Sequence, residues 1–160
     1  MTPSGPKSGE VRVRMAEPRD AEMLAAFNRA MAMETESKPL EPETIGAGVS
    51  AVFAAPDKGF YVVAECAGDA VGALMITFEW SDWRNGFFWW IQSVYVSPDF
   101  RRRGIYARLH DFVVERAKAA GNVYGFRLYV ERNNALAQNV YASMDMYETG
   151  YLMFEQRLLT

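Results

Sequence analysis

Short apolar runs, separated by glycine, proline and polar residues, divide this chain into segments with strand-like and helix-like patterns. Apolar and charged residues alternate over 11–14, which is typical of a strand. Two longer runs, 60–67 and 70–80, flank Gly68-Asp69 and predict a β-hairpin. A third run, 87–96, is so apolar that it predicts a central strand covered on both faces.

Apolar residues spaced three or four positions apart predict helices between these strands. The first helix begins near Asp20, a candidate N-cap, and a second covers 43–54. A third starts at Ile105 and ends at Gly121, because glycine readily takes the left-handed conformation that closes a helix. A fourth follows a cap at Asn133-Asn134.

Two further strands are predicted over 125–130 and 151–158. The predicted order of elements mixes hairpins with strand–helix–strand units, which implies an α/β (α+β) fold with a mixed sheet flanked by about four helices. Residues 1–9 are rich in proline, glycine and serine and predict a flexible tail. Residues 10–160 are then expected to form a single domain.

Composition narrows the function classes. The 160 residues carry a net charge of −3, so no global field favours nucleic acid or an anionic membrane. The single cysteine, Cys66, fits a reducing compartment, and we expect a cytoplasmic protein. No apolar run approaches the roughly 20 residues of a membrane helix. One histidine and one cysteine offer no metal-ligand spacing, so no metal is expected.

The most informative segment is V-Y-V-S-P-D-F-R-R-R-G-I-Y-A-R-L, residues 94–109. A buried strand here runs through a short turn into a helix, whose first amides have no partner inside the helix. Together with the helix dipole, these amides can bind a pyrophosphate. Gly104 lets the backbone approach closely, and Arg101 to Arg103 add positive charge. A solvated arginine run at a helix start is the alternative interpretation.

This segment resembles the acetyl-CoA signature of GNAT acetyltransferases, Q/R-x-x-G-x-G/A. Arg101 and Gly104 match the signature, whereas Tyr106 stands where the family usually has Gly or Ala. The resemblance implies a GNAT-like fold with a six- to seven-stranded sheet. It also implies a set of cofactor-binding residues: Val94, Val96, Arg101, Arg102, Arg103, Gly104, Ile105, Tyr106, Ala107, Asn134 and Tyr141.

A second segment is similar to the family's last helix, N-x-x-A-x-x-x-Y-x-x-L-G-F. Asn134, Ala137 and Tyr141 keep the spacing, but Asp145 replaces the glycine of the ending. Aspartate tolerates left-handed backbone geometry better than most residues, so the turn can survive. A core tyrosine that packs with its neighbours is the alternative interpretation of Tyr141.

The resemblance implies an acetyl-CoA-dependent N-acetyltransferase that works through a ternary complex. Tyr141 would be the general acid for the leaving thiolate, and the backbone N–H of Val94 the oxyanion donor. Some members carry a glutamate base where this chain has Trp90. Glu79 is the nearest carboxylate by sequence and a candidate base, and a water chain to bulk solvent is the alternative.

The acceptor is expected to be a small-molecule or peptide amine. The segments that usually frame it hold carboxylates and tryptophans, a combination that favours a cationic amine: Glu34, Glu36, Glu79, Asp82, Trp80 and Trp83. The alternative interpretation of these residues is that the carboxylates are ordinary solvated surface and the tryptophans belong to the core. The family resemblance leaves a homodimer open, and a non-catalytic acyl-CoA-binding or regulatory module on the same fold is the alternative function. A nucleic-acid-binding role for the arginines is disfavoured by the acidic balance.

Overall fold

The computed structural model describes residues 9–159 of the chain. One compact unit ends at Leu128 and a second begins at Tyr129, and each is described by itself. The flexible tail predicted over residues 1–9 lies, except for Gly9, outside the described residues.

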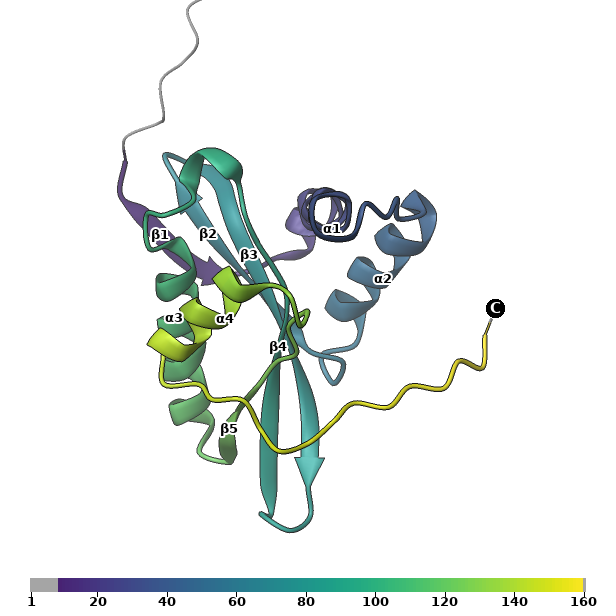
Figure 1. Cartoon of the computed structure of the whole chain (residues 1–160). Helices are drawn as coiled ribbons and strands as arrows, with labels where there is room; N and C mark the ends of the chain where they lie inside the picture. The colour runs from purple at the N-terminus through teal and green to yellow at the C-terminus, as the bar shows by residue number, and fades with distance from the viewer. Residues whose placement is uncertain (1–8, 160) are drawn as a thin grey trace, which may run out of the picture. The chain divides into compact units, whose positions relative to one another are not determined.

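A five-stranded sheet forms the centre of the first unit (Figure 1). Its strands lie in chain order: β1 (Val11–Met15), β2 (Phe60–Cys66), β3 (Asp69–Ser81), β4 (Gly86–Val96) and β5 (Val123–Arg127). The first four pair antiparallel, whereas β4 and β5 pair parallel. The predicted mixed sheet and the hairpin at Gly68 are therefore confirmed.

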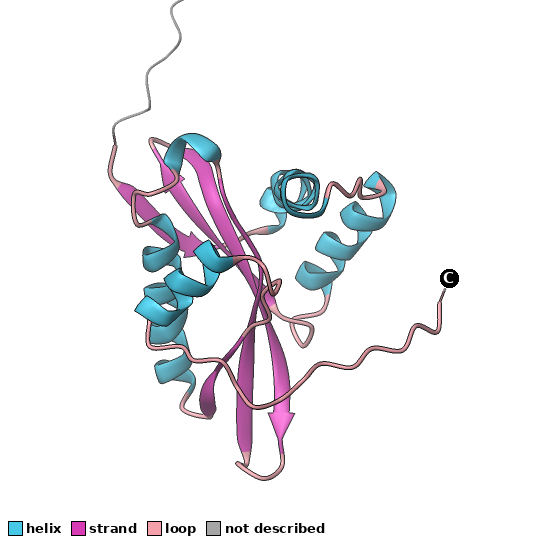
Figure 2. Cartoon of the chain, in the orientation of Figure 1, coloured by secondary structure: helices cyan, strands magenta, loops and turns pink. Residues whose placement is uncertain are grey.

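The expected six to seven strands are not all present, since the described residues contain five. Residues 151–159 form no strand and are drawn as loop in Figure 2. Alternation of apolar residues describes which side chains could share a face, but a strand also needs a neighbouring backbone to complete its hydrogen bonds. The described part of the chain provides no such ladder for 151–158.

Three longer helices belong to the first unit and one to the second. They are α1 (Ala21–Glu36), α2 (Pro42–Ala54) and α3 (Ile105–Ala120), followed by α4 (Ala135–Ser143). A short 3₁₀ turn, η1 (Pro18–Asp20), directly precedes α1, and a second one, η2 (Pro98–Phe100), lies between β4 and α3. Gly121 closes α3 with a φ of 78°, as predicted. The Asn134 side chain caps α4 by accepting from the amide of Ala137 at 3.1 Å.

Asp20 stands at the N-cap position of α1, but its side chain caps no amide of that helix. Its carboxylate instead accepts two hydrogen bonds from Arg14, at 2.8 and 2.9 Å. Arg14 also donates to Glu65 at 2.8 Å, so one guanidinium joins β1, β2 and the start of α1. The predicted cap is replaced by an ion-pair network because Arg14 on the neighbouring strand is a stronger partner than a helix amide.

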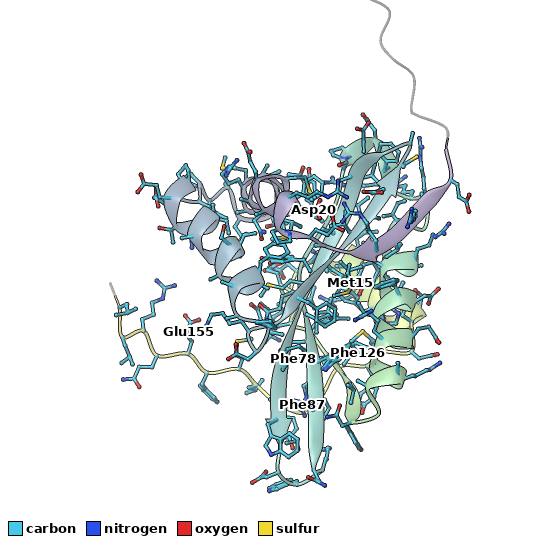
Figure 3. The ribbon with its side chains drawn as sticks, turned by 180° about the vertical axis from the view of Figure 1, so that it is seen from behind. Met15, Asp20, Phe78, Phe87, Phe126 and Glu155 are labelled. Atoms are coloured by element: carbon cyan, nitrogen blue, oxygen red, sulfur yellow. The ribbon has the colours of Figure 1, made fainter. Side chains whose placement is uncertain are left out.

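Helices cover both faces of the sheet. Val62 and Ala64 on β2 face α3, whose fully buried Leu109 and Val113 lie one turn apart. Val63, between them, faces α1 and α2 instead. This period of two lets one strand serve two cores. On the α3 face an aromatic cluster extends the core across three strands: Phe78, Phe87, Trp89 and Phe126, three of which are labelled in Figure 3.

Candidate active site

Strands β4 and β5 pair over only part of their length. Their last paired residues are Trp90 and Arg127, after which β4 continues to Val96 without a β5 partner. Ser93 lies in this stretch with a φ of 52°, at a register shift between β3 and β4 that marks a bulge. Val94 and Val96, the predicted strand contacts for the cofactor, therefore lie where β4 has no strand on its β5 side among the described residues.

The turn before α3 has the geometry of an anion site. Arg102 and Gly104 take positive φ values of 62° and 73°. The first intrahelical bond runs from the Arg108 amide to the Gly104 carbonyl at 3.1 Å, and no side chain caps the helix start. The amides of residues 105–107 consequently have no acceptor within the helix, and amides at this position are the usual donors to an anion at a helix start.

Gly72 on β3 seats the start of α3 against the sheet. A Cβ at this position would lie 3.1 Å from Ile105 Cγ2 and 3.1 Å from the Tyr95 carbonyl oxygen. Since Ile105 is buried and is the first residue of α3, the missing side chain sets how closely the helix start approaches β3. The packing of Ile105 against Gly72 therefore positions the turn before α3 on the sheet.

The three predicted arginines have different surroundings. Arg101 donates to Glu34 on α1 at 2.6 Å and to the Val96 carbonyl at 2.8 Å. Arg103 lies over the Phe100 ring, at 5.2 Å from its centroid. Arg102 is exposed and forms no ion pair within the described residues. The Arg101 charge is thus already offset by a carboxylate, which the run of arginines in the sequence does not indicate.

The candidate base Glu79 lies in a network on the sheet. One of its oxygens accepts from Trp90 Nε1 at 3.0 Å, and the other from Arg127 Nη1 at 2.6 Å. Arg127 also stacks on Phe88, with its guanidinium carbon 3.5 Å from the ring centroid. Three neighbouring strands contribute to this network, and Trp90 and Arg127 are the last pair before β4 and β5 part.

These side chains share the sheet face on which α1 and α2 pack. Met75 belongs to the α1/α2 core, and residues two and four positions further along β3 face the same way. The register places Trp90 beside Thr77 and Phe88 beside Glu79. Gln92 donates to Thr77 at 2.6 Å, which continues the polar row along β3 and β4.

The remaining predicted acceptor-side residues lie apart from this network. Trp83 is 87% exposed in the turn between β3 and β4, and its amide donates to Asp82. Trp80 is exposed and packs against Phe87. Glu36 is exposed at the end of α1.

In the second unit, the predicted helix motif folds as expected. Asn134 caps α4, and Tyr141 lies two turns further along the same helix. Burial raises the pKa of the Tyr141 phenol above its ordinary value, which keeps it protonated at neutral pH. Asp145 takes a φ of 61°, so aspartate does accept the left-handed geometry of the lost glycine.

Sequence reasoning missed Arg127 and Phe88. The signal that could have found them is the single charge in the segment V-Y-G-F-R-L, 123–128. A charge within an apolar strand needs a partner, and Glu79 is the carboxylate it pairs with. Among residues 9–159, no group of three His, Cys, Asp or Glu is arranged to hold a metal ion. Within the same range, no helix has the length and apolarity needed to cross a bilayer.

Comparison with known proteins gives a consistent family signal. A model of the acetyltransferase (GNAT) family matches residues 22–146. A structure described as a possible acetyltransferase from Clostridium difficile 630 is 40% identical, with a TM-score of 0.88. That match covers 94% of this chain and 99% of the other. No curated protein matches the chain.

Two more distant structures share the fold. One is described as a predicted acetyltransferase with acetyl-CoA from Clostridium acetobutylicum, at 18% identity and a TM-score of 0.78. It covers 92% of this chain and 96% of its own. The other is a ribosomal-protein-alanine N-acetyltransferase from Brucella melitensis biovar Abortus 2308, at 16% identity and a TM-score of 0.74. It covers 93% of this chain and 99% of its own.

Proposed function

This chain belongs to the GNAT family of acetyltransferases, and from that membership we propose that it transfers an acetyl group from acetyl-CoA to a primary amine. The observation that carries the proposal is the turn at Gly104, where positive φ values and uncapped helix amides make a cradle for a pyrophosphate. A lone cysteine is consistent with action in the cytoplasm.

The described residues fit acetyl-CoA in two respects. A Cβ built on Gly104 would meet nothing within 4 Å, so the backbone there is open to a ligand. Within residues 9–159, the stretch of β4 from Gln92 to Val96 has no strand partner on its β5 side, and an extended pantetheine arm can hydrogen-bond to such an edge. Bound acetyl-CoA would supply an activated thioester carbonyl.

In this proposal the protein contributes mainly by positioning the thioester and the amine, and less by activating either of them. Holding two reactants in a reactive geometry is worth up to roughly 7–11 kcal/mol. The Val94 N–H would stabilise negative charge on the carbonyl oxygen, a contribution of roughly 3–4 kcal/mol for one donor. Tyr141 would protonate the departing thiolate, a role taken from the family resemblance. Its raised pKa suits that role, because the phenol stays protonated at working pH.

The contacts of Glu79 bear on which group takes the amine proton. Both of its oxygens already accept hydrogen bonds, from Trp90 and Arg127. Taking up a proton would neutralise the carboxylate and weaken its ion pair with Arg127, so we assign the amine proton to solvent water. Glu79→Gln should then change kcat less than tenfold with an acceptor that lacks a carboxylate. A loss above a hundredfold, the usual scale for a general base, would restore Glu79 to that role.

The proposed function is tested with acetyl-CoA and a panel of amines, by measuring the release of free thiol. We expect release above the hydrolysis blank for at least one amine, and calorimetric binding of CoA with a Kd well below millimolar. Binding without release for every amine would favour the non-catalytic acyl-CoA-binding module. Absence of CoA binding would overturn the proposal.

A further inference from the structure

We propose that Arg127 binds a carboxylate on the acceptor, so that the acceptor is an amine that also carries a carboxylate, as an amino acid does. This inference rests on the proposed function and names the substrate class of the same site. It depends on the position of Arg127 in the sheet, on how its guanidinium is held, and on the charges around it.

The position follows from the pairing of the strands. The Gly104 cradle lies beyond one end of the unpaired stretch of β4, and the Trp90–Arg127 pair lies at the other end. A ligand held by both the cradle and the unpaired edge is therefore directed toward Trp90 and Arg127. Side chains on the sheet face at that pair are the ones placed to meet a second substrate.

The guanidinium of Arg127 is fixed before any ligand arrives. Stacking on Phe88 at 3.5 Å sets the plane of the group, and the bond from Nη1 to Glu79 sets its rotation within that plane. Phe88 is itself buried, so the ring on which the guanidinium stacks is held in place by its neighbours. A preorganised fork loses less conformational entropy when it binds a planar anion.

Donors remain on Arg127 after these contacts. A guanidinium carries five N–H groups, and Arg127 makes one hydrogen bond within the described residues. Its side chain is 26% exposed, so part of the group reaches the surface. A carboxylate on the acceptor can form two parallel hydrogen bonds to one edge of the Arg127 guanidinium. A cationic group on the acceptor has no such lone pairs to offer to this arginine.

The surrounding charges disfavour the cationic acceptor predicted from the sequence. Two of the four predicted acidic residues are neutralised by arginine, Glu79 by Arg127 and Glu34 by Arg101. A second guanidinium, that of Arg84, lies 5.1 Å from the Phe88 ring centroid. The Phe88 ring therefore stands beside two positive groups, of which only Arg127 is bonded to a carboxylate.

The experiment compares amino acids with their amides as acetyl acceptors. Each amide keeps the amine and side chain but loses the carboxylate. For the best amino acid, we expect kcat/KM to exceed that of its amide at least tenfold. Arg127→Gln should raise KM for the acid roughly tenfold to a hundredfold, as expected for loss of a charge-assisted hydrogen bond, with a smaller change in kcat. The same variant should leave the amide unaffected.

Arg84→Gln is the matched control, because Arg84 also lies over Phe88 but comes from the exposed turn. Calorimetric CoA binding shows that each variant is folded, and calorimetric binding of the amino acid to CoA-saturated protein gives a readout independent of turnover. Equal use of acid and amide, or an acid preference unchanged by Arg127→Gln, would overturn the inference while the proposed function stands. A preference lost only in Arg84→Gln would also overturn it. Failure of CoA binding in the wild type would instead overturn the proposed function.

Discussion

Arg101 and Glu34 form an ion pair of 2.6 Å between the turn before α3 and the end of α1. The same guanidinium donates to the Val96 carbonyl and lies over the Tyr95 ring. An arginine of the proposed phosphate turn is therefore tied to a helix on the opposite face of the sheet. Its charge becomes fully available to an anion only when the carboxylate is removed or displaced.

Glu34→Gln should strengthen CoA binding. Both side chains are about 40% exposed, at 43% and 40%, so the pair resembles a surface ion pair worth about 0.2–1 kcal/mol. Removing its carboxylate should lower the Kd for CoA by about 1.5-fold to fivefold at low salt, measured by calorimetry. Glu36→Gln, two residues further along α1, is the control and should leave the Kd unchanged. A weaker affinity in Glu34→Gln would show that the pair supports the turn rather than competing with the ligand.

Alanine variants of the two glycines at the ends of α3 distinguish an effect on ligand binding from an effect of backbone strain. Gly104 and Gly121 have φ values of 73° and 78°, and a Cβ on either would meet nothing within 4 Å. Alanine at each should cost about 1–2 kcal/mol in the free energy of unfolding, because only the left-handed backbone resists it. We expect Gly104→Ala to weaken CoA binding several-fold and Gly121→Ala to leave it unchanged. Equal Kd values for CoA in the two variants would show that Gly104 is not part of the binding site.

Tyr141→Phe tests the general acid. The rate of thiol release should fall by about a hundredfold or more, while the Kd for CoA changes little, because the ring is kept and only the proton donor is lost. Since burial raises the Tyr141 pKa, the wild-type rate should show no decline from this group below about pH 10. Tyr147→Phe, at an exposed tyrosine of the second unit, is the control. An undiminished rate in Tyr141→Phe would rule out the assignment.

The Arg14–Asp20 pair predicts a specific acid sensitivity. Hydrogen bonds from Arg14 hold the pKa of Asp20 below its ordinary value. A lowered folded-state pKa contributes stability that is present above the unfolded pKa of about 3.9 and is lost as the pH falls through the folded value. Asp20→Asn should lower the free energy of unfolding at pH 7 by roughly 1.5–3 kcal/mol, the range for hydrogen bonds to charged groups.

Urea unfolding at pH 7 and at pH 3 measures this effect, and the difference between wild type and Asp20→Asn should shrink in acid. Arg19→Gln is the comparison, since Arg19 pairs with Glu17 on the exposed surface and should contribute nothing measurable. A difference that is the same at both pH values would show that Asp20 acts through packing and not through its charge.

Most of the helices and strands could be predicted, because each depends on a local pattern. Gly68, Gly121 and Asn134 end or begin elements through their own backbone or side-chain chemistry, and the structure confirms them. The strand predicted over 151–158 was wrong because strand formation depends on a partner that local alternation does not provide.

The sequence by itself determined the fold class, the turn at Gly104 and the helix motif of Asn134 and Tyr141, since these are read within a few neighbouring residues. Only the tertiary structure decided the partners of the charges. Glu79 meets Arg127 across 48 positions, and Arg101 meets Glu34 across 67. Sheet register and helix packing bring such pairs together, and Coulomb attraction depends on distance in space, not along the chain. Which arginine a carboxylate pairs with is therefore decided by the fold.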